Sequence, residues 1–144
     1  MDLTGEYVPG TWASSAKQVA AYEASDGAKG NKLMGKPVVI VTMRGARSGK
    51  IRKTPLMRVE HDGSYALVAS VGGAPNNPDW YHNIATNQTV MLQDGPVRKE
   101  YKARLVSGAE RDQWWRRAVE AFPTYESFRK KTGREIPVFV LDPS

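Results

Sequence analysis

Residues 36–60 read KPVVIVTMRGARSGKIRKTPLMRVE, and this stretch decides the fold. Pro37 precedes a β-branched run at residues 38–42, whose composition is typical of a buried strand. The glycines of residues 45–50 indicate a turn, after which residues 51–60 are expected to return as the partner strand of a hairpin. The middle of the chain therefore predicts antiparallel β structure.

The returning strand is expected to have two different faces. With a side-chain period of two, Arg52, Thr54 and Leu56 point to one face. Pro55 points to the other face and has no N–H to donate to a ladder, so the strand is expected to be irregular or to lie at a sheet edge. Such a strand leaves backbone groups available to a ligand.

The same stretch concentrates the positive charge of the chain. The whole sequence has 21 Lys and Arg against 15 Asp and Glu, a net charge of +6. Residues 44–58 contain six cations and no acid, so they account for the entire excess: Arg44, Arg47, Lys50, Arg52, Lys53 and Arg58. A local cationic surface attracts and orients an anionic partner. We therefore expect a local anion-binding site.

The turn at residues 45–50 has only a superficial likeness to a nucleotide phosphate loop. Three residues separate its glycines where that loop needs four, and Ile51 stands where Ser or Thr would follow the lysine. Nucleotide hydrolysis is therefore not expected. Backbone amides with Arg47 and Lys50 would suit a phosphate or a carboxylate. The alternative is a solvated hairpin tip whose charges hold no ligand.

The rest of the chain adds strands and helices to this hairpin. Asp-Gly pairs mark tight turns, and further strands are expected at residues 65–71, 89–93, 97–106 and 136–141. Capping boxes at Ser15 and Ser107 indicate helix starts. Helices are expected at residues 15–25, 78–84, 108–122 and 125–132.

About six antiparallel strands and three to four helices predict a mainly β fold with helices (α+β). An antiparallel barrel satisfies this count because closure removes exposed strand edges. Residues 1–144 are expected to form a single domain. Within it, residues 1–12 are expected to be a flexible N-terminal arm, and residues 26–35 a connecting loop.

Composition excludes several classes of function. The chain has no cysteine and two histidines, so disulfides and thiol catalysis are excluded and no metal site is expected. No signal peptide is recognisable, and no segment has the roughly 20 apolar residues of a membrane span. A cytoplasmic location is therefore expected. Nucleic acid is not expected as a partner, since aromatic residues are not interleaved with the cations.

Several ordered blocks together resemble the deazaflavin (coenzyme F-420)-dependent nitroreductase family of actinobacteria. They run from about residue 35 to the end, and they include TMRGARSG at 42–49, TPL at 54–56, VASVGG at 68–73 and NPDWYHN at 77–83. The resemblance implies a split β-barrel similar to FMN-binding barrels. It also implies an 8-hydroxy-5-deazaflavin coenzyme (coenzyme F-420) that carries a phosphodiester and an oligoglutamate tail.

The resemblance implies cofactor-binding roles for particular positions. The basic turn and the strand after it would meet the phosphate, the tail and the ring through Arg47, Ser48, Gly49, Arg52, Thr54, Pro55 and Leu56. The ring edge would lie against Ala69, Ser70, Val71 and Gly72, and the other side would be closed by Trp80, Tyr81 and Asn83.

Two hydroxyl groups are the candidates for a catalytic role. Ser70 would hydrogen-bond the ring or a substrate carbonyl, and Tyr125 would position an acceptor or supply a proton. Their alternatives are a serine that caps a strand end and a helix aromatic that packs in the core. Phe128 stands where some relatives have a tyrosine facing the substrate. Tyr125 and Phe128 are therefore the expected substrate residues.

The function implied is that of a deazaflavin-dependent reductase. Because the coenzyme itself carries the hydride chemistry, no catalytic triad is expected. The acceptor would be a small, apolar, electron-poor molecule: a quinone, a nitroaromatic or an unsaturated lactone or ester. The alternatives are an FMN-dependent split-barrel oxidoreductase and a non-catalytic cofactor-binding protein. The protein would be a monomer or a dimer, and a quinone acceptor would imply peripheral contact with the inner face of the membrane.

Overall fold

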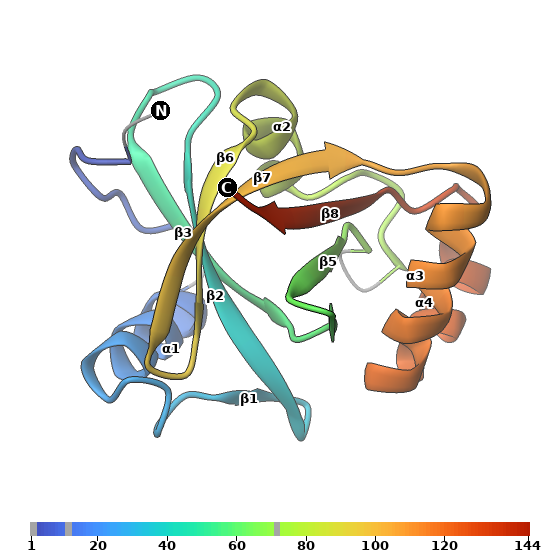
Figure 1. Cartoon of the computed structure of the whole chain (residues 1–144), viewed down its shortest axis with the longest axis horizontal. Coiled ribbons are helices and arrows are strands. Elements are labelled where there is room, and N and C mark those ends of the chain that lie inside the picture. The colour runs from blue at the N-terminus through green and yellow to red at the C-terminus, as the bar shows by residue number, and fades with distance from the viewer. Residues whose placement is uncertain (1–2, 11–12, 71–72) are drawn as a thin grey trace.

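The fold is built on one curled antiparallel sheet with helices packed outside it (Figure 1). The computed structural model describes residues 3–10, 13–70 and 73–144. Its strands are β1 (Lys32–Leu33), β2 (Lys36–Arg44), β3 (Ile51–Met57), β4 (Glu60–His61), β5 (Ser64–Val68), β6 (Thr89–Asp94), β7 (Val97–Leu105) and β8 (Val138–Pro143).

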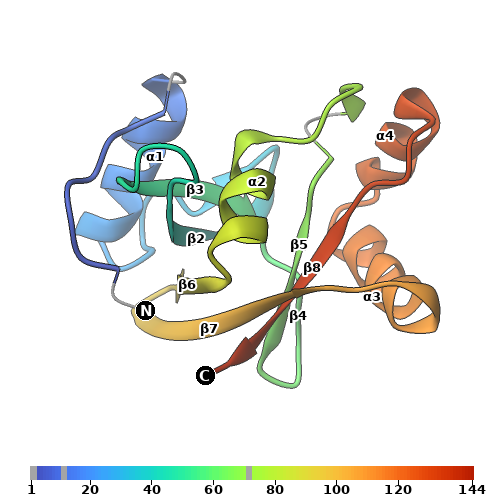
Figure 2. The ribbon, with the colours of Figure 1, turned by 90° about the horizontal axis from the view of Figure 1, so that it is seen from above.

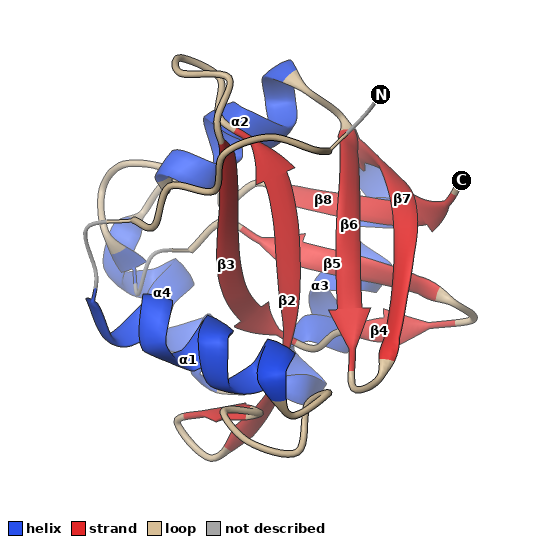
Figure 3. Ribbon diagram, turned by 90° about the vertical axis from the view of Figure 1, so that its left-hand side faces the viewer, coloured by secondary structure: helices blue, strands red, loops and turns tan. Residues whose placement is uncertain are grey.

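The sheet curls because its two halves cross one another. The strand order is β1-β2-β6-β7-β8-β5-β4, and β3 pairs with β2 outside this path. Figure 3 shows β3, β2, β6 and β7 running across β8, β5 and β4, which lie behind them. This arrangement confirms the predicted mainly β fold, in which two short strands, β1 and β4, accompany the six expected ones.

The β2–β3 hairpin forms as its sequence predicts. The two strands pair antiparallel with Val41 opposite Thr54 and Ile40 opposite Pro55. Within the described residues β3 has no second strand neighbour, which agrees with the edge position that Pro55 indicates. The strand ends at Met57, so the expected extension to residue 60 is wrong, and residues 60–61 instead form β4 against β5.

Both faces of β2 are buried, which explains its unbroken apolar sequence. Val38 and Ile40 belong to a core cluster that also contains Trp114 and Trp115 of the third helix. Val39 and Val41 belong to a second cluster with residues of β5, β6, β7 and β8. A strand that is covered on both sides has no polar face to alternate with.

Within the described residues four helices surround the sheet, and Figure 2 shows α2 lying between α1 on one side and α3 and α4 on the other. The capping box predicted at Ser15 is wrong, whereas the helix start predicted at Ser107 is confirmed without the hydrogen bonds of a capping box. Ser15 lies inside α1, where Gln18 donates to Gly30 O and Lys32 O instead. Ser107 is the N-cap residue of α3, its side chain makes no capping hydrogen bond, and the Glu110 carboxylate accepts from Arg104. The helices are α1 (Ala13–Ala24), α2 (Asp79–Thr86), α3 (Gly108–Ala121) and α4 (Thr124–Thr132).

The N-terminal segment lies along the start of β3. The N–H of Ile51 donates to Glu6 O at 2.8 Å, and the N–H of Val8 donates to Ile51 O at 2.9 Å. Arg44 donates to Thr4 O at 3.0 Å. These contacts attach residues 4–8 to the barrel, and the flexibility of the arm remains a prediction.

Candidate functional site

A pocket of about 600 Å³ lies beside β3 and is bounded by α2, α4 and the end of β5. Its volume is within the range of about 300–1,000 Å³ that is usual for small-molecule sites. Residues from both faces of β3 line it, from Arg52 to Met57, so the pocket runs along the free edge of this strand. An unpaired strand edge offers backbone donors and acceptors to a ligand.

The pocket brings together nine of the residues expected from the sequence. They come from β3, from the segment after β5, from α2 and from α4, and they are Arg52, Thr54, Pro55, Leu56, Ser70, Trp80, Asn83, Tyr125 and Phe128. These positions are up to 76 residues apart in the sequence, from Arg52 to Phe128. Only the folded barrel brings them to one place.

Other expected residues lie elsewhere. Residues 47–49 form the exposed tip of the β2–β3 turn and are not part of the pocket wall. Ala69 is fully buried, and its carbonyl accepts from Arg134. Tyr81 packs against Phe139 with ring centroids 5.5 Å apart, in the second core cluster. Val71 and Gly72 lie outside the described residues.

The basic turn is connected to the pocket through Asn83. Its side-chain Oδ1 accepts from the N–H of Ala46 at 2.9 Å, which joins α2 to the turn. The N–H of Lys50 donates to Ser48 Oγ at 3.1 Å, and Gly49 adopts φ +70°, a conformation that favours glycine. Asn83 and Ser48 therefore shape the turn, whether or not they also contact a ligand.

The six cations of this region do not form one surface. Lys53 pairs with Glu23 at 2.8 Å, Lys50 with Glu6 at 3.3 Å, and Arg58 with Asp94 at 2.9 Å. Arg44 donates to the backbone at Gly49 O and Thr4 O. Among the described residues, no acid pairs with Arg47 or Arg52. The candidate anion site therefore narrows to these two arginines, of which only Arg52 lines the pocket.

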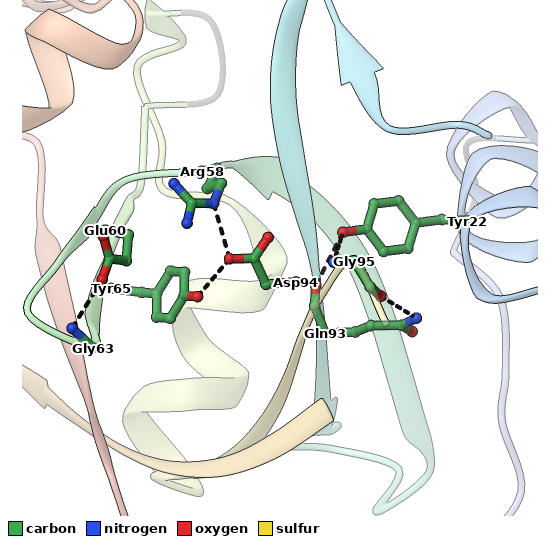
Figure 4. A network of polar contacts seen from close by, with 8 residues as sticks. All are labelled: Tyr22, Arg58, Glu60, Gly63, Tyr65, Gln93, Asp94 and Gly95. Carbon is green, nitrogen blue, oxygen red and sulfur yellow. Dashed lines mark hydrogen bonds and ion pairs between the residues drawn. The ribbon is translucent and has the colours of Figure 1, made fainter. Parts of the chain in front are cut away.

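Arg58 instead belongs to a structural network beyond the end of β3 (Figure 4). The Asp94 carboxylate accepts from Arg58 Nε at 2.9 Å and from the Tyr65 hydroxyl at 2.6 Å. Burial and the neighbouring Asp94 carboxylate raise the pKa of Tyr65 above its usual range. This network ties the end of β3 to the β6–β7 turn and to β5, and none of its residues lines the pocket.

Two hydroxyl groups are placed to meet a ligand inside the pocket. Tyr125 is 5% exposed and packs edge-on against Phe122, with ring centroids 5.0 Å apart. Burial raises the pKa of its hydroxyl, which therefore remains protonated at neutral pH and is a hydrogen-bond donor rather than a base. Ser70 is 7% exposed at the end of β5. No described residue hydrogen-bonds either hydroxyl, so both remain available.

Some pocket residues were missed by the sequence reasoning. Leu33 and Met34 stand at the pocket and are 41% and 69% exposed. An apolar pair inside a Gly- and Lys-rich loop was the signal that could have identified them. Asn77 and Asp79 also line the pocket, but no local pattern distinguishes them from ordinary loop residues.

Two classes of site find no support in the part of the chain that the structure describes. No group of three or more His, Asp or Glu side chains there could hold a metal ion. No helix in the described ranges has the length and the apolar character needed to cross a bilayer.

Comparison with known proteins supplies one consistent group of relatives. A family model described as F420-H(2)-dependent quinone reductase matches residues 14–143. A putative F420-H(2)-dependent quinone reductase of Mycobacterium tuberculosis is 34% identical over 107 residues, which cover 74% of this chain and 90% of that protein.

Two solved structures share both the fold and much of the sequence. One is described as an F420-H2 dependent reductase (FDR-A); it is 50% identical, has a TM-score of 0.71, and the match covers 74% of this chain and 94% of that one. The other is described as a domain-swapped dimer; it is 44% identical with a TM-score of 0.73, over 88% of this chain and 93% of that one.

Proposed function

The chain belongs to the F420-H(2)-dependent quinone reductase family, and on that premise we propose that it is a deazaflavin-dependent reductase. Its coenzyme is coenzyme F-420, and its acceptor is a small, electron-poor molecule of the quinone type. The observation that carries this proposal is the pocket along the free edge of β3, with the guanidinium of Arg52, which pairs with no described acid, in its wall.

The residues present suit a planar ring that carries an anionic tail. Leu56 and Trp80 provide apolar and aromatic surface, and the free strand edge provides backbone groups for the polar rim of a ring. Arg52 offers a planar, two-pronged donor for a phosphate or a carboxylate. Arg47, at the turn beyond the pocket wall, would meet the more distant part of the tail. The site residues expected from the sequence are therefore retained in this proposal, apart from those with no described position.

The protein's own groups would bind, orient and exclude water. When bound, the reduced coenzyme supplies a hydride, and a quinone that accepts it together with a proton becomes the hydroquinone. The protonated hydroxyl of Tyr125 would donate a hydrogen bond to an acceptor oxygen, and Ser70 would do the same from the end of β5. Phe122 and Phe128 pack around Tyr125 and keep its side of the pocket apolar.

The test is a coenzyme oxidation assay under anaerobic conditions. The purified protein, mixed with reduced coenzyme F-420 and a soluble quinone, should restore the visible absorbance of the oxidised deazaflavin. Absence of coenzyme binding at micromolar concentrations would overturn the proposal. A protein that copurifies with a yellow, fluorescent flavin would instead support an FMN-dependent oxidoreductase. Coenzyme binding without any quinone reduction would support a non-catalytic cofactor-binding protein.

A more specific proposal concerns the place in the cell where the protein encounters its acceptor. Leu33 and Met34 form an exposed apolar tip at the pocket, and exposed Lys29, Lys32 and Lys36 surround it. Such a combination suits the interface of an anionic bilayer, where a lipid-soluble quinone would be available. We propose that this tip makes a peripheral membrane contact at the inner face of the membrane.

Vesicle sedimentation tests the membrane contact. The protein should sediment with anionic vesicles more than with neutral ones, and Leu33→Ser with Met34→Ser should reduce this binding. Leu105→Ser is the matched control, because Leu105 is 56% exposed on β7 and does not line the pocket. Equal sedimentation of all variants would contradict the assignment. Light scattering on the same protein variants, measured without vesicles, would show whether the chain is a monomer or a dimer.

A further inference from the structure

Arg134 makes more polar contacts with the connection between β5 and α2, which borders the pocket, than any cation of the basic turn does. It follows α4 in the connection to β8, and all three of its guanidinium nitrogens donate hydrogen bonds. Its acceptors are Ala69 O at 2.9 Å, Ser70 O at 3.4 Å, Ala74 O at 3.1 Å, Asn76 O at 3.2 Å and Asn77 Oδ1 at 2.7 Å.

These acceptors lie at the two ends of the connection between β5 and α2. Ala69 and Ser70 follow β5, whereas Asn76 and Asn77 come just before Pro78, the residue that precedes α2. One rigid guanidinium therefore sets the separation of the strand end from the helix start. Ser70 and Asn77 both line the pocket, so this guanidinium is bonded to two residues of the pocket wall.

Helix α4, which forms a third wall of the pocket, also contacts the connection between β5 and α2. Thr132, the last residue of α4, donates to Ala74 O at 2.9 Å. Gly73 approaches α4 so closely that an added Cβ would lie 3.1 Å from Phe128 O. Contacts that involve Arg134, Thr132 and Gly73 thus join α4, which carries Tyr125, to the segment that joins β5 and α2.

We propose that Arg134 is a positioning residue of the pocket. It touches neither the coenzyme nor the acceptor, and it acts by holding the Ser70 carbonyl, the Asn76 carbonyl and the Asn77 side chain at a set distance from each other and from α4. Arginine suits this task because its planar fork reaches several acceptors in fixed directions, which a lysine ammonium cannot do. The proposal rests on the proposed function, since the pocket it shapes is the coenzyme site.

The experiment measures coenzyme affinity and stability in matched variants. Arg134→Ala and Arg134→Lys should each weaken the binding of coenzyme F-420 about tenfold, since most of the hydrogen bonds to the connection between β5 and α2 are lost. Arg129→Ala is the control, because Arg129 lies five residues earlier and its side chain pairs, among the described residues, with Glu126 on the same helix. Its coenzyme affinity should equal that of the wild type.

Chemical rescue separates positioning from general stability. Millimolar guanidinium ion should fill the space left in Arg134→Ala and restore coenzyme affinity, while an equal concentration of sodium chloride should not. If Arg134→Ala does not fold, the same comparison is made on Arg134→Lys, whose affinity must fall below that of Arg129→Ala. Wild-type affinity in both Arg134 variants, or the absence of rescue in a folded Arg134→Ala, would overturn the inference. A wild-type protein that does not bind the coenzyme would overturn both proposals.

Discussion

Replacing Arg52 by alanine should separate coenzyme binding from folding. The Arg52 side chain is half-buried in the pocket wall, and no acid among the described residues pairs with it. Its removal therefore breaks no ion pair within the described residues, and a substitution of this kind changes the free energy of unfolding by about 0.5 kcal/mol or less.

The expected loss of affinity is much larger. A charge-assisted hydrogen bond contributes about 1.5–3 kcal/mol, and a tenfold change in Kd corresponds to about 1.4 kcal/mol. If Arg52 binds the phosphate or a carboxylate of the coenzyme, Arg52→Ala should raise the Kd about 10- to 100-fold. Arg52→Lys should fall between the two, because lysine keeps the charge and loses the fork.

The assay is a fluorescence titration of coenzyme F-420 combined with urea unfolding of each variant. Added salt should weaken binding to the wild type more than binding to Arg52→Ala, since the variant has lost a charged contact. Arg58→Ala is the matched control on the same chain segment. Its partner is Asp94, away from the pocket, so it should lose stability, by about 1 kcal/mol or less for a partly exposed pair, and keep its coenzyme affinity.

Two outcomes for the coenzyme Kd of these variants would contradict a role of Arg52 in binding the anionic tail. An unchanged Kd in Arg52→Ala would show that the coenzyme does not use this guanidinium. An equal loss of affinity in Arg52→Ala and Arg58→Ala would show that net charge, rather than the position in the pocket, controls binding. Either result would remove the placement of the anionic tail beside β3.

Three further substitutions test other parts of the structure. Tyr65→Phe should lower the free energy of unfolding by about 1–2 kcal/mol, because a hydroxyl bonded to the Asp94 carboxylate is lost. Since the pKa of Tyr65 is raised, this stabilisation should be complete below about pH 10 and fade above it, as urea unfolding across pH would show. Gly73→Ala should destabilise more than Gly63→Ala: both have positive φ (+84° and +82°), but only at Gly73 does an added Cβ meet backbone within 4 Å, so thermal melts of the pair isolate the close approach. Tyr125→Phe should keep the melting temperature and raise the KM for a quinone, and wild-type activity should show no loss from Tyr125 ionisation up to about pH 10, because burial raises its pKa; an unchanged KM would assign this residue to packing alone.

Local patterns were sufficient for the hairpin at the centre of the fold. The β-branched run of β2 and the alternation in β3 depend on a side-chain period of two, which any strand imposes. Pro55 indicated an edge because it lacks an N–H, and that edge is where the pocket lies. The box at Ser107 correctly indicated the start of α3, but the bonds of the two boxes do not form, and Gln18 and Glu110 bind partners outside their own helices instead.

The sequence showed how many cations the basic stretch contains, but not which of them are paired with acids in the folded protein. Six cations within residues 44–58 suggested one anion-binding surface. In the folded protein, Lys53 meets Glu23 and Arg58 meets Asp94, acids that are 30 and 36 residues away in the sequence. No pattern within the basic stretch could identify these neutralising partners.

The sequence by itself determined the strand pair, its free edge and the family to which the pocket residues belong, because these depend on local periodicity and on residue types in order. The tertiary structure alone decided which arginine of the basic stretch remains available to a ligand inside the pocket. It also revealed Arg134, whose surrounding sequence carries no motif and whose five acceptors lie 57 to 65 residues earlier. The physical reason is that ion pairs and hydrogen bonds between residues so far apart in the sequence form only when the curled sheet brings distant segments together.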